Sequence, residues 1–226
     1  MFFSGPGVGL ILVAMVLAML AQLKIQSAYQ KYSAMRVRSG RTGAQVAREL
    51  LKQAGLDDVT VEAVGGRLSD HYDPRVRRVR LSEQVYNGAS IAALGVAAHE
   101  ASHAAQHAEG YAPLALRTAL LPVAGIGSNL AFPLFFAGYL FSAPALMDVG
   151  ILFFSAAVLF QFVTLPVEFN ASSRAVELLA AGGYVTREEE GPVRDMLRAA
   201  GYTYLAATAV ALANLLRLML LRDRRG

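Results

Sequence analysis

Two histidines four residues apart, in the run His99-Glu100-Ala101-Ser102-His103, are the side chains best suited to chemistry. On a helix they share one face, about 6 Å apart along the axis, so both imidazoles can bind one ion. Glu100 points away from the face that His99 and His103 share, and it can take a proton from water, as a general base does. We expect a zinc site here. The alternative is that both histidines are satisfied polar groups in a helix bundle.

A third zinc ligand must come from elsewhere, because a catalytic zinc ion usually takes three protein ligands. The chain has no cysteine, so imidazole and carboxylate groups must supply them. Glu168 is the first charged residue after a long apolar stretch and stands near a predicted helix start, which suits a carboxylate. We expect Glu168 to complete the site. Asp148, in Asp148-Val149-Gly150, is similar to the aspartate ligand of intramembrane site-2 proteases, but it lies at a predicted turn.

His107 continues the four-residue spacing of the histidines. It lies eight residues after His99, about 12 Å along a helix, whereas zinc bonds to imidazole are about 2.1 Å long. One ion therefore cannot bind His99, His103 and His107 together. We expect His107 to serve the fold or to support a ligand.

Long uncharged stretches favour a membrane protein, as does a hydrophobic content of 55%. Phe2–Leu23 is long enough to cross about 30 Å of hydrocarbon as a helix. The uncharged stretches 118–147 and 149–167 predict a membrane hairpin that turns near Ser142–Asp148. A last uncharged stretch covers Ala199–Leu216 and either crosses the bilayer, lies in its interface or packs on the protein.

Basic residues follow the first apolar stretch from Lys24 onward and end the chain after the last one. This placement is typical of membrane-flanking charge and not of a nucleic-acid surface, so no nucleic-acid partner is expected. The positive-inside rule places the N-terminus outside and the zinc site on the cytoplasmic side. No basic stretch precedes Phe2–Leu23, so we expect this segment to be retained and not cleaved as a signal.

The stretches between the apolar segments predict a folded domain. Thr42–Leu56 reads as an amphipathic helix with Thr42 as its cap and Gly55 as its stop, and Ser90–Glu109 as a buried helix that carries the histidines. Val59–Val64 and Val76–Leu81 alternate apolar and polar residues, with Gly65-Gly66 as a turn, which predicts a small sheet with one charged face.

The strand Val76–Leu81, if it has a free edge, could bind an extended substrate by main-chain hydrogen bonds. His71 and Tyr72 just before it are candidates to stabilise an oxyanion. The alternative is a turn with a packed Tyr72. A further helix is expected from Pro166 to the Gly182-Gly183 stop.

Two segments together resemble the YugP-like family of membrane zinc metallopeptidases, and the resemblance extends over nearly the whole chain. The first is His71-Tyr72-Asp73-Pro74 with Val79-Arg80-Leu81-Ser82, leading into Ala97-Ala98-His99-Glu100; the second is Leu165-Pro166-Val167-Glu168-Phe169-Asn170-Ala171-Ser172-Ser173-Arg174-Ala175. The order of the elements is more distantly similar to that of HtpX-type and CAAX-prenyl endoproteases.

The resemblance implies that His99, His103 and Glu168 bind zinc and that Glu100 is the catalytic base. The distant relatives usually carry an aspartate four residues after the glutamate ligand, and this chain has Ser172 there. Ser172, Asn170 or a backbone carbonyl could orient a zinc-binding histidine instead. Arg174, in the same segment, is a further candidate to support the site or bind substrate.

The expected fold is an α-helical multi-pass membrane protein with a small zincin-like α+β catalytic domain that combines the HExxH helix, a short β-sheet and a glutamate helix. Its expected divisions are a transmembrane helix (1–25), the first part of the catalytic domain (26–113), a transmembrane hairpin (114–166), the glutamate helix and second part of the catalytic domain (167–201), and a C-terminal membrane-associated helix with a basic tail (202–226).

The expected activity is zinc-dependent hydrolysis of peptide bonds in membrane or membrane-proximal proteins, at a cell membrane. The partners are a protein or peptide substrate and the lipid bilayer; any regulatory membrane protein or oligomer is not readable from the sequence. The alternative is a non-catalytic membrane scaffold or protease adaptor stabilised by zinc, which would have no need of Glu100. A small transporter would need ionisable groups within its spans, and 118–147 has none.

Overall fold

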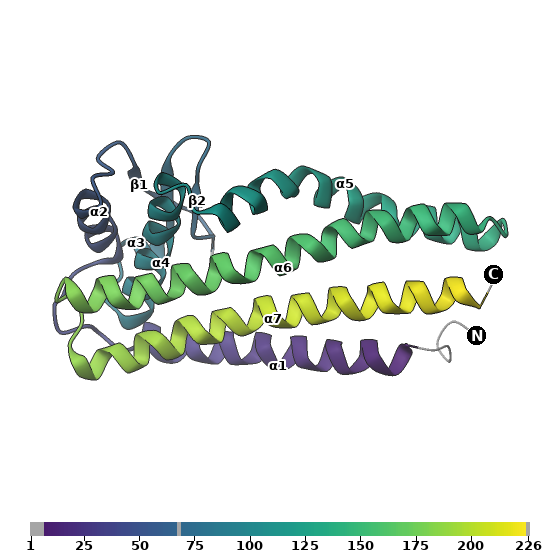
Figure 1. Ribbon diagram of the computed structural model, residues 1–226. Helices are drawn as coiled ribbons and strands as arrows, with labels where there is room; N and C mark the ends of the chain where they lie inside the picture. Colours follow the sequence, from purple (N-terminus) through teal and green to yellow (C-terminus); the bar gives the residue numbers. More distant parts are fainter. Residues whose placement is uncertain (1–6, 67–68, 225–226) are drawn as a thin grey trace. The chain divides into compact units, whose positions relative to one another are not determined.

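The computed structural model describes residues 7–66 and 69–224, and these form a mostly helical protein with one small sheet (Figure 1). In chain order the elements are α1 (Val8–Ser33), α2 (Gly43–Gln53), β1 (Thr60–Val64), β2 (His71–Asp73), β3 (Arg78–Ser82), α3 (Glu83–Tyr86), α4 (Ile91–Ala108), α5 (Ala112–Leu140), α6 (Pro144–Ala181) and α7 (Arg187–Asp223).

The chain divides into two compact units. The sheet unit comprises Leu23–Ala112 and Val167–Gly201. The apolar unit comprises the described residues up to Gln22, Pro113–Pro166, and the described residues from Tyr202 onward. Because α1, α6 and α7 each contribute residues to both units, the chain passes between them within helices.

The sheet has the strand order β1-β3-β2, with β1 parallel and β2 antiparallel to β3. The central strand β3 therefore pairs on both sides, so the condition for substrate binding at a free edge of Val76–Leu81 is not met. His71 and Tyr72 form β2 and not the turn of the alternative, whereas Tyr72 packs against the core as that alternative expected. Gly65-Gly66 does not join β1 directly to β3: parallel strands need a crossover, and the segment between them includes β2.

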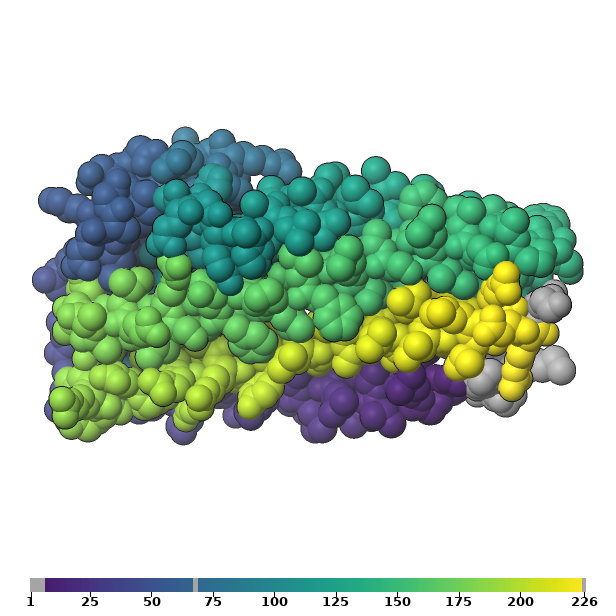
Figure 2. All heavy atoms as spheres, viewed as in Figure 1, coloured from purple at the N-terminus to yellow at the C-terminus, as the bar shows by residue number. Residues whose placement is uncertain are grey.

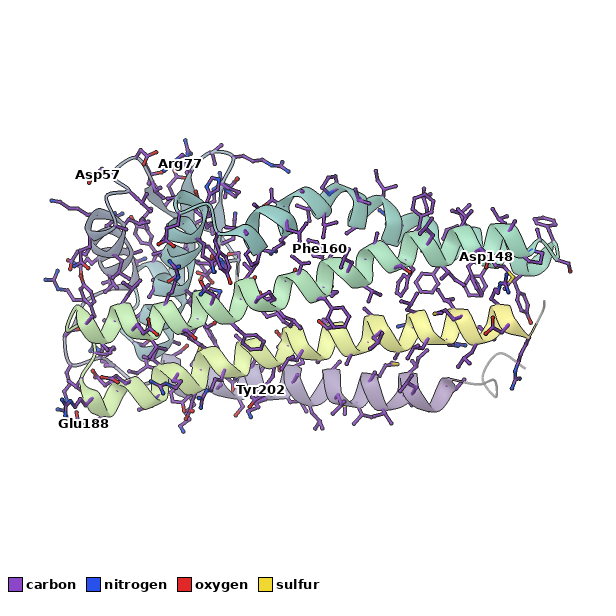
Figure 3. The ribbon with its side chains drawn as sticks, viewed as in Figure 1. Asp57, Arg77, Asp148, Phe160, Glu188 and Tyr202 are labelled. Atoms are coloured by element: carbon purple, nitrogen blue, oxygen red, sulfur yellow. The ribbon has the colours of Figure 1, made fainter. Side chains whose placement is uncertain are left out.

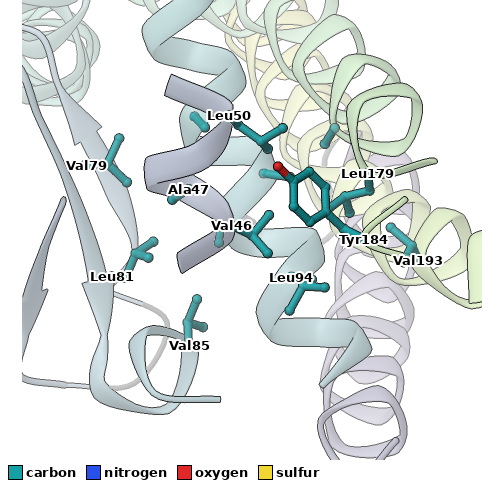
Figure 4. Packing of buried hydrophobic residues seen from close by; sticks show 14 of the residues in the cluster. Val46, Ala47, Leu50, Val79, Leu81, Val85, Leu94, Leu179, Tyr184 and Val193 are labelled. Atoms are coloured by element: carbon teal, nitrogen blue, oxygen red, sulfur yellow. The ribbon is translucent and has the colours of Figure 1, made fainter. Parts of the chain in front are cut away.

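The core of the sheet unit begins with the alternation in β3. Val79 and Leu81 are fully buried, whereas Arg78 on the other face pairs with Glu62 of β1 at 2.9 Å. This confirms the expected charged face. Figure 4 shows the apolar side chains of β3 directed towards α2 and α4, where they join the same core as Val46.

Helix α2 begins and ends as the sequence predicts. The hydroxyl of Thr42 accepts a hydrogen bond from the Gln45 backbone, and the Gln45 side chain accepts one from the Thr42 backbone, which is a complete capping box. Gly55 follows the helix at φ +69°, a conformation that glycine adopts at little cost. Gly43 lies against the backbone of Val85, where an added Cβ would be 2.3 Å from the carbonyl oxygen.

Helix α4 confirms the buried helix expected over Ser90–Glu109. The Ser90 hydroxyl caps it by accepting from the Ala93 backbone at 3.2 Å. Most of its side chains are buried up to Gln106, which explains why small alanines dominate the run. A helix this enclosed places its polar side chains in fixed surroundings.

Four helices in the described part of the chain are long and apolar enough to cross a membrane: α1, α5, α6 and α7. In the apolar unit, Phe135 of α5, Met147 of α6 and Leu218 of α7 share one core, and α7, which contains the last apolar stretch, is also one of the four candidate spans. Figure 2 shows side chains of α6 and α7 in contact along this unit. The α5–α6 turn falls at residues 141–143, so it overlaps only the start of the turn expected near Ser142–Asp148, and Asp148 lies inside α6.

Helix boundaries differ from the expected ones because uncharged stretches mark only the part of a helix that fits hydrocarbon. Helix α1 continues to Ser33, past the expected end near residue 25, and the first residues of the expected Phe2–Leu23 helix lie outside the described residues. The expected helix start at Pro166 is wrong, because α6 runs through this proline. Proline is tolerated inside long apolar helices, where neighbouring groups compensate for the lost hydrogen bond.

Gly43→Ala is expected to destabilise the sheet unit, because a Cβ would meet backbone that cannot move aside. Overpacking of this kind lowers the free energy of unfolding by about 1–3 kcal/mol. Gly191→Ala is the matched control, because this glycine of α7 has open space around it. The substitution is expected to raise the free energy of unfolding by about 0.5–1 kcal/mol. Thermal melting followed by circular dichroism in detergent checks both, and an unchanged melting temperature for Gly43→Ala would contradict the packing described.

Candidate metal centre

Three side chains from two helices of the sheet unit converge on one point. His99 and His103 stand on successive turns of α4, and Glu168 stands on α6. The Glu168 Oε2 atom lies 3.3 Å from His99 Nε2 and 3.6 Å from His103 Nε2. All three side chains are largely buried, with 14%, 10% and 4% of their surfaces exposed, respectively. The sequence prediction that these three residues meet agrees with this geometry.

The donor set fits a tetrahedral zinc ion. Bonds of about 2.0–2.1 Å at tetrahedral angles place ligand atoms about 3.4 Å apart. The distances of 3.3 and 3.6 Å from the carboxylate oxygen to the two ring nitrogens are close to that value. Two imidazoles and one carboxylate leave a fourth position for water or substrate, as catalytic zinc sites do. Among the described residues, this is the group of histidine and acidic side chains close enough to hold an ion.

The other nitrogen of each imidazole is occupied by a neutral partner. His99 Nδ1 lies 3.2 Å from the Ser172 hydroxyl, and His103 Nδ1 lies 2.9 Å from Gln106 Oε1. These contacts leave the Nε2 atoms to face Glu168. Ser172 therefore stands where the sequence placed a replacement for the missing aspartate, whereas Asn170 contacts neither histidine but Gln106.

Charge around His103 favours a cation in the cluster. Burial on its own would lower the pKa of His103, but the hydrogen bond with Glu168 and the charges of Glu100 and Glu168 raise it. The surroundings therefore attract positive charge despite being buried. A divalent cation bound to the same atoms would take the place of this proton.

Glu100 is buried beside the cluster, with 8% of its surface exposed. It directly follows His99 on α4, and its charge contributes to the raised pKa of His103, so the two side chains interact electrostatically. A buried carboxylate next to a metal-type cluster is suited to exchange protons with water there.

The remaining predicted residues lie outside the three-residue cluster. His107 Nδ1 is 2.9 Å from the hydroxyl of Tyr72, and burial raises the pKa of Tyr72. His71 is exposed, with its Nδ1 2.7 Å from the carbonyl oxygen of Ser69. Arg174 makes two contacts of 2.7 Å with Glu109, whose pKa this hydrogen bond lowers.

Asp148 does not belong to the cluster. It stands twenty positions before Glu168 on the same helix, which is about 30 Å along the axis. Figure 3 labels Asp148 on α6, in the apolar unit. Its carboxylate accepts two hydrogen bonds from Arg222 of α7, at 2.7 and 3.0 Å. It does not take the ligand role of the site-2 protease alternative.

Gln106 is the residue of the site that sequence reasoning missed. It is fully buried, and it contacts His103, Asn170 and the carbonyl oxygen of Val167. A signal was available: a long polar side chain three residues after His103, on a helix apolar on nearly every side, must find hydrogen-bond partners inside the protein. Its partners could not be named, because they depend on how α4 and α6 pack.

The fold and the site together define a class of protein: within residues 7–66 and 69–224 it is mostly helical, with four helices apolar enough for a membrane and a buried cluster of two histidines and a glutamate suited to zinc. A family model described as "Putative neutral zinc metallopeptidase" matches residues 8–223, and the chain belongs to this family. It is 49% identical over 212 residues, 94% of each chain, to "Putative membrane protease YugP" of Bacillus subtilis (strain 168). The comparison with solved structures found no match.

Glu168→Ala is expected to abolish stoichiometric zinc binding, because two imidazoles alone make a weak site. Glu177→Ala removes an exposed carboxylate from the same helix and is expected to leave zinc content unchanged. Metal analysis of both purified variants, after dialysis against a mild chelator, makes the comparison. Full zinc content in Glu168→Ala would reject Glu168 as a ligand.

Proposed function

We propose that the chain is a membrane-embedded zinc endopeptidase that hydrolyses peptide bonds of membrane or membrane-proximal proteins. One observation carries the proposal: two imidazole nitrogens and a carboxylate oxygen converge at the spacing of tetrahedral zinc ligands, with the buried carboxylate of Glu100 beside them. The family and the name of the B. subtilis relative support a protease, and the four apolar helices support a place in the membrane.

In this mechanism His99, His103 and Glu168 hold the zinc ion. When bound, zinc lowers the pKa of a coordinated water and polarises the scissile carbonyl. Glu100 accepts the proton of the attacking water and then donates it to the nitrogen of the leaving peptide. The carbon–nitrogen bond breaks, which leaves a new carboxyl end and a new amino end. Ser172 and Gln106 hold the imidazole rings in orientation throughout.

The zincin-like character of the sheet unit is part of this proposal. The HExxH helix α4, a three-stranded sheet and the glutamate-bearing part of α6 all belong to that unit. Helix α4 carries the two histidines and Glu100, and α6 carries the third ligand, Glu168. A zinc peptidase with a glutamate ligand is expected to distribute its site residues over two helices in this way.

A non-catalytic scaffold stabilised by zinc is the second candidate function. It accounts for the three ligands but not for Glu100, since burying one more carboxylate beside the cluster costs free energy without adding a ligand. A peptidase needs a proton acceptor at that place. The position of Glu100 therefore favours the enzyme.

Glu100→Gln is expected to retain zinc and to lower kcat by roughly 10²–10⁴-fold, the usual contribution of a general base. Cleavage of an unstructured protein such as casein by the purified protein in detergent measures this, with zinc content determined on the same sample. Glu83→Gln, an exposed residue of α3, serves as the control and is expected to cleave as the wild type does. Wild-type activity in Glu100→Gln would refute its role as the base.

We further propose that the sheet unit faces the cytoplasm, from the basic residues that follow the first apolar stretch. The chain has no cysteine, so a single introduced thiol reports on its own position. Asp57→Cys, in an exposed loop after α2, is expected to react with a membrane-impermeant maleimide in inverted vesicles and to stay unlabelled in intact cells. Labelling in intact cells would reverse the orientation.

A further inference from the structure

The amide of Gln106 is fully buried between α4 and α6 and contacts three polar groups. Its Oε1 atom lies 2.9 Å from His103 Nδ1. Its Nε2 atom donates one hydrogen bond to the carbonyl oxygen of Val167, at 3.0 Å, and another to Asn170 Oδ1, at 2.9 Å. A side-chain amide has two N–H donors, and both are used here.

These contacts fix which way the amide points. If it were flipped, its NH₂ group would face His103, and its oxygen would face the carbonyl oxygen of Val167, which can only accept, so the flipped arrangement is unfavourable. The Oε1 atom must therefore face His103 and accept a hydrogen bond from its ring. A ring that donates from Nδ1 presents its lone pair at Nε2, the atom that faces Glu168.

We propose that Gln106 is a positioning residue of the zinc site: it fixes the ring orientation and tautomer of His103, and Asn170 acts through it by fixing the amide. This rests on the proposed zinc function. The bond to the Val167 carbonyl gives Gln106 a second role, because Val167 directly precedes Glu168 on α6. One amide thus links a histidine ligand on α4 to the backbone that carries the glutamate ligand.

A neutral amide suits this place better than the carboxylate that often supports a zinc-binding histidine. Glu100 and Glu168 already place two buried carboxylates around His103. A third carboxylate, in place of the Gln106 amide, would add charge repulsion with these two in a poorly solvated site. A carboxylate also has no N–H to offer the Val167 carbonyl and Asn170 Oδ1, so both α6 contacts would be lost.

The test is the zinc dissociation constant, measured by competition with a chromophoric chelator on zinc-stripped protein in detergent. Gln106→Leu keeps the side chain buried but removes its polar atoms, and it is expected to weaken zinc binding roughly 10- to 100-fold. Asn170→Ala frees the amide without touching His103 and is expected to weaken binding by a smaller factor.

Gln53→Leu is the matched control, because Gln53 also makes a long-range side-chain hydrogen bond, to the Tyr184 hydroxyl at 3.0 Å, at a place that includes none of the zinc-site residues. It is expected to leave zinc affinity unchanged. Melting temperatures of all variants show whether loss of stability alone moves the dissociation constant.

Wild-type zinc affinity in Gln106→Leu, with a lowered melting temperature, would overturn the proposal and leave Gln106 a purely structural residue. If Gln106→Leu does not fold, Asn170→Ala decides: an unchanged dissociation constant overturns the proposal and a weakened one supports it. A wild-type protein that binds no zinc would refute the proposed function itself, and the role of Gln106 with it.

Discussion

Burial of the Glu168 carboxylate between two imidazoles is the interaction on which the rest of the site depends. A carboxylate with 4% of its surface exposed is costly unless positive charge or hydrogen-bond donors surround it. The two Nε2 atoms within 3.6 Å supply that environment, and they do so only while α4 and α6 keep their packing. Gln106 to Val167, Ser172 to His99 and Arg174 to Glu109 all join these two helices.

The two histidines are brought together by local helix geometry, whereas the glutamate reaches them only through long-range folding. Local sequence fixes the pair, because four residues on any helix bring two side chains to one face. The glutamate is separated from it by 64 residues, 104–167, that include all of α5 and the start of α6. In the sequence, the long apolar segment therefore interrupts the unit that holds the site. The folding of that segment determines whether Glu168 meets His99 and His103.

Elements specified by local signals were predictable from the sequence. Thr42 with Gln45 marks the start of α2, and Ser90 marks the start of α4. The motif from His99 to His103 and the first acid after the apolar stretch gave the three residues of the cluster. Ser172 was one of three alternatives that the resemblance to distant relatives implied, because it stands where they carry an aspartate, and it contacts His99.

Features that depend on distant pairing were not predictable. The placement of β2 beside β3 is one, since alternation in the sequence does not say which strands are neighbours. The partners of Gln106 are another, since they lie on α6 and follow from packing. The continuation of α6 through Pro166 is a third, because the proline signal favours a helix start, whereas the apolar surroundings allow a proline inside the helix.

X-ray absorption at the zinc edge of the purified wild-type protein identifies the atoms bound to the metal, and therefore whether His99, His103 and Glu168 form a zinc site. We expect one zinc ion per chain, four-coordinate, with two imidazole ligands and oxygen for the rest, at distances of about 2.0–2.2 Å. A protein purified without zinc, or zinc surrounded by oxygen atoms alone with no imidazole scattering, would contradict this expectation.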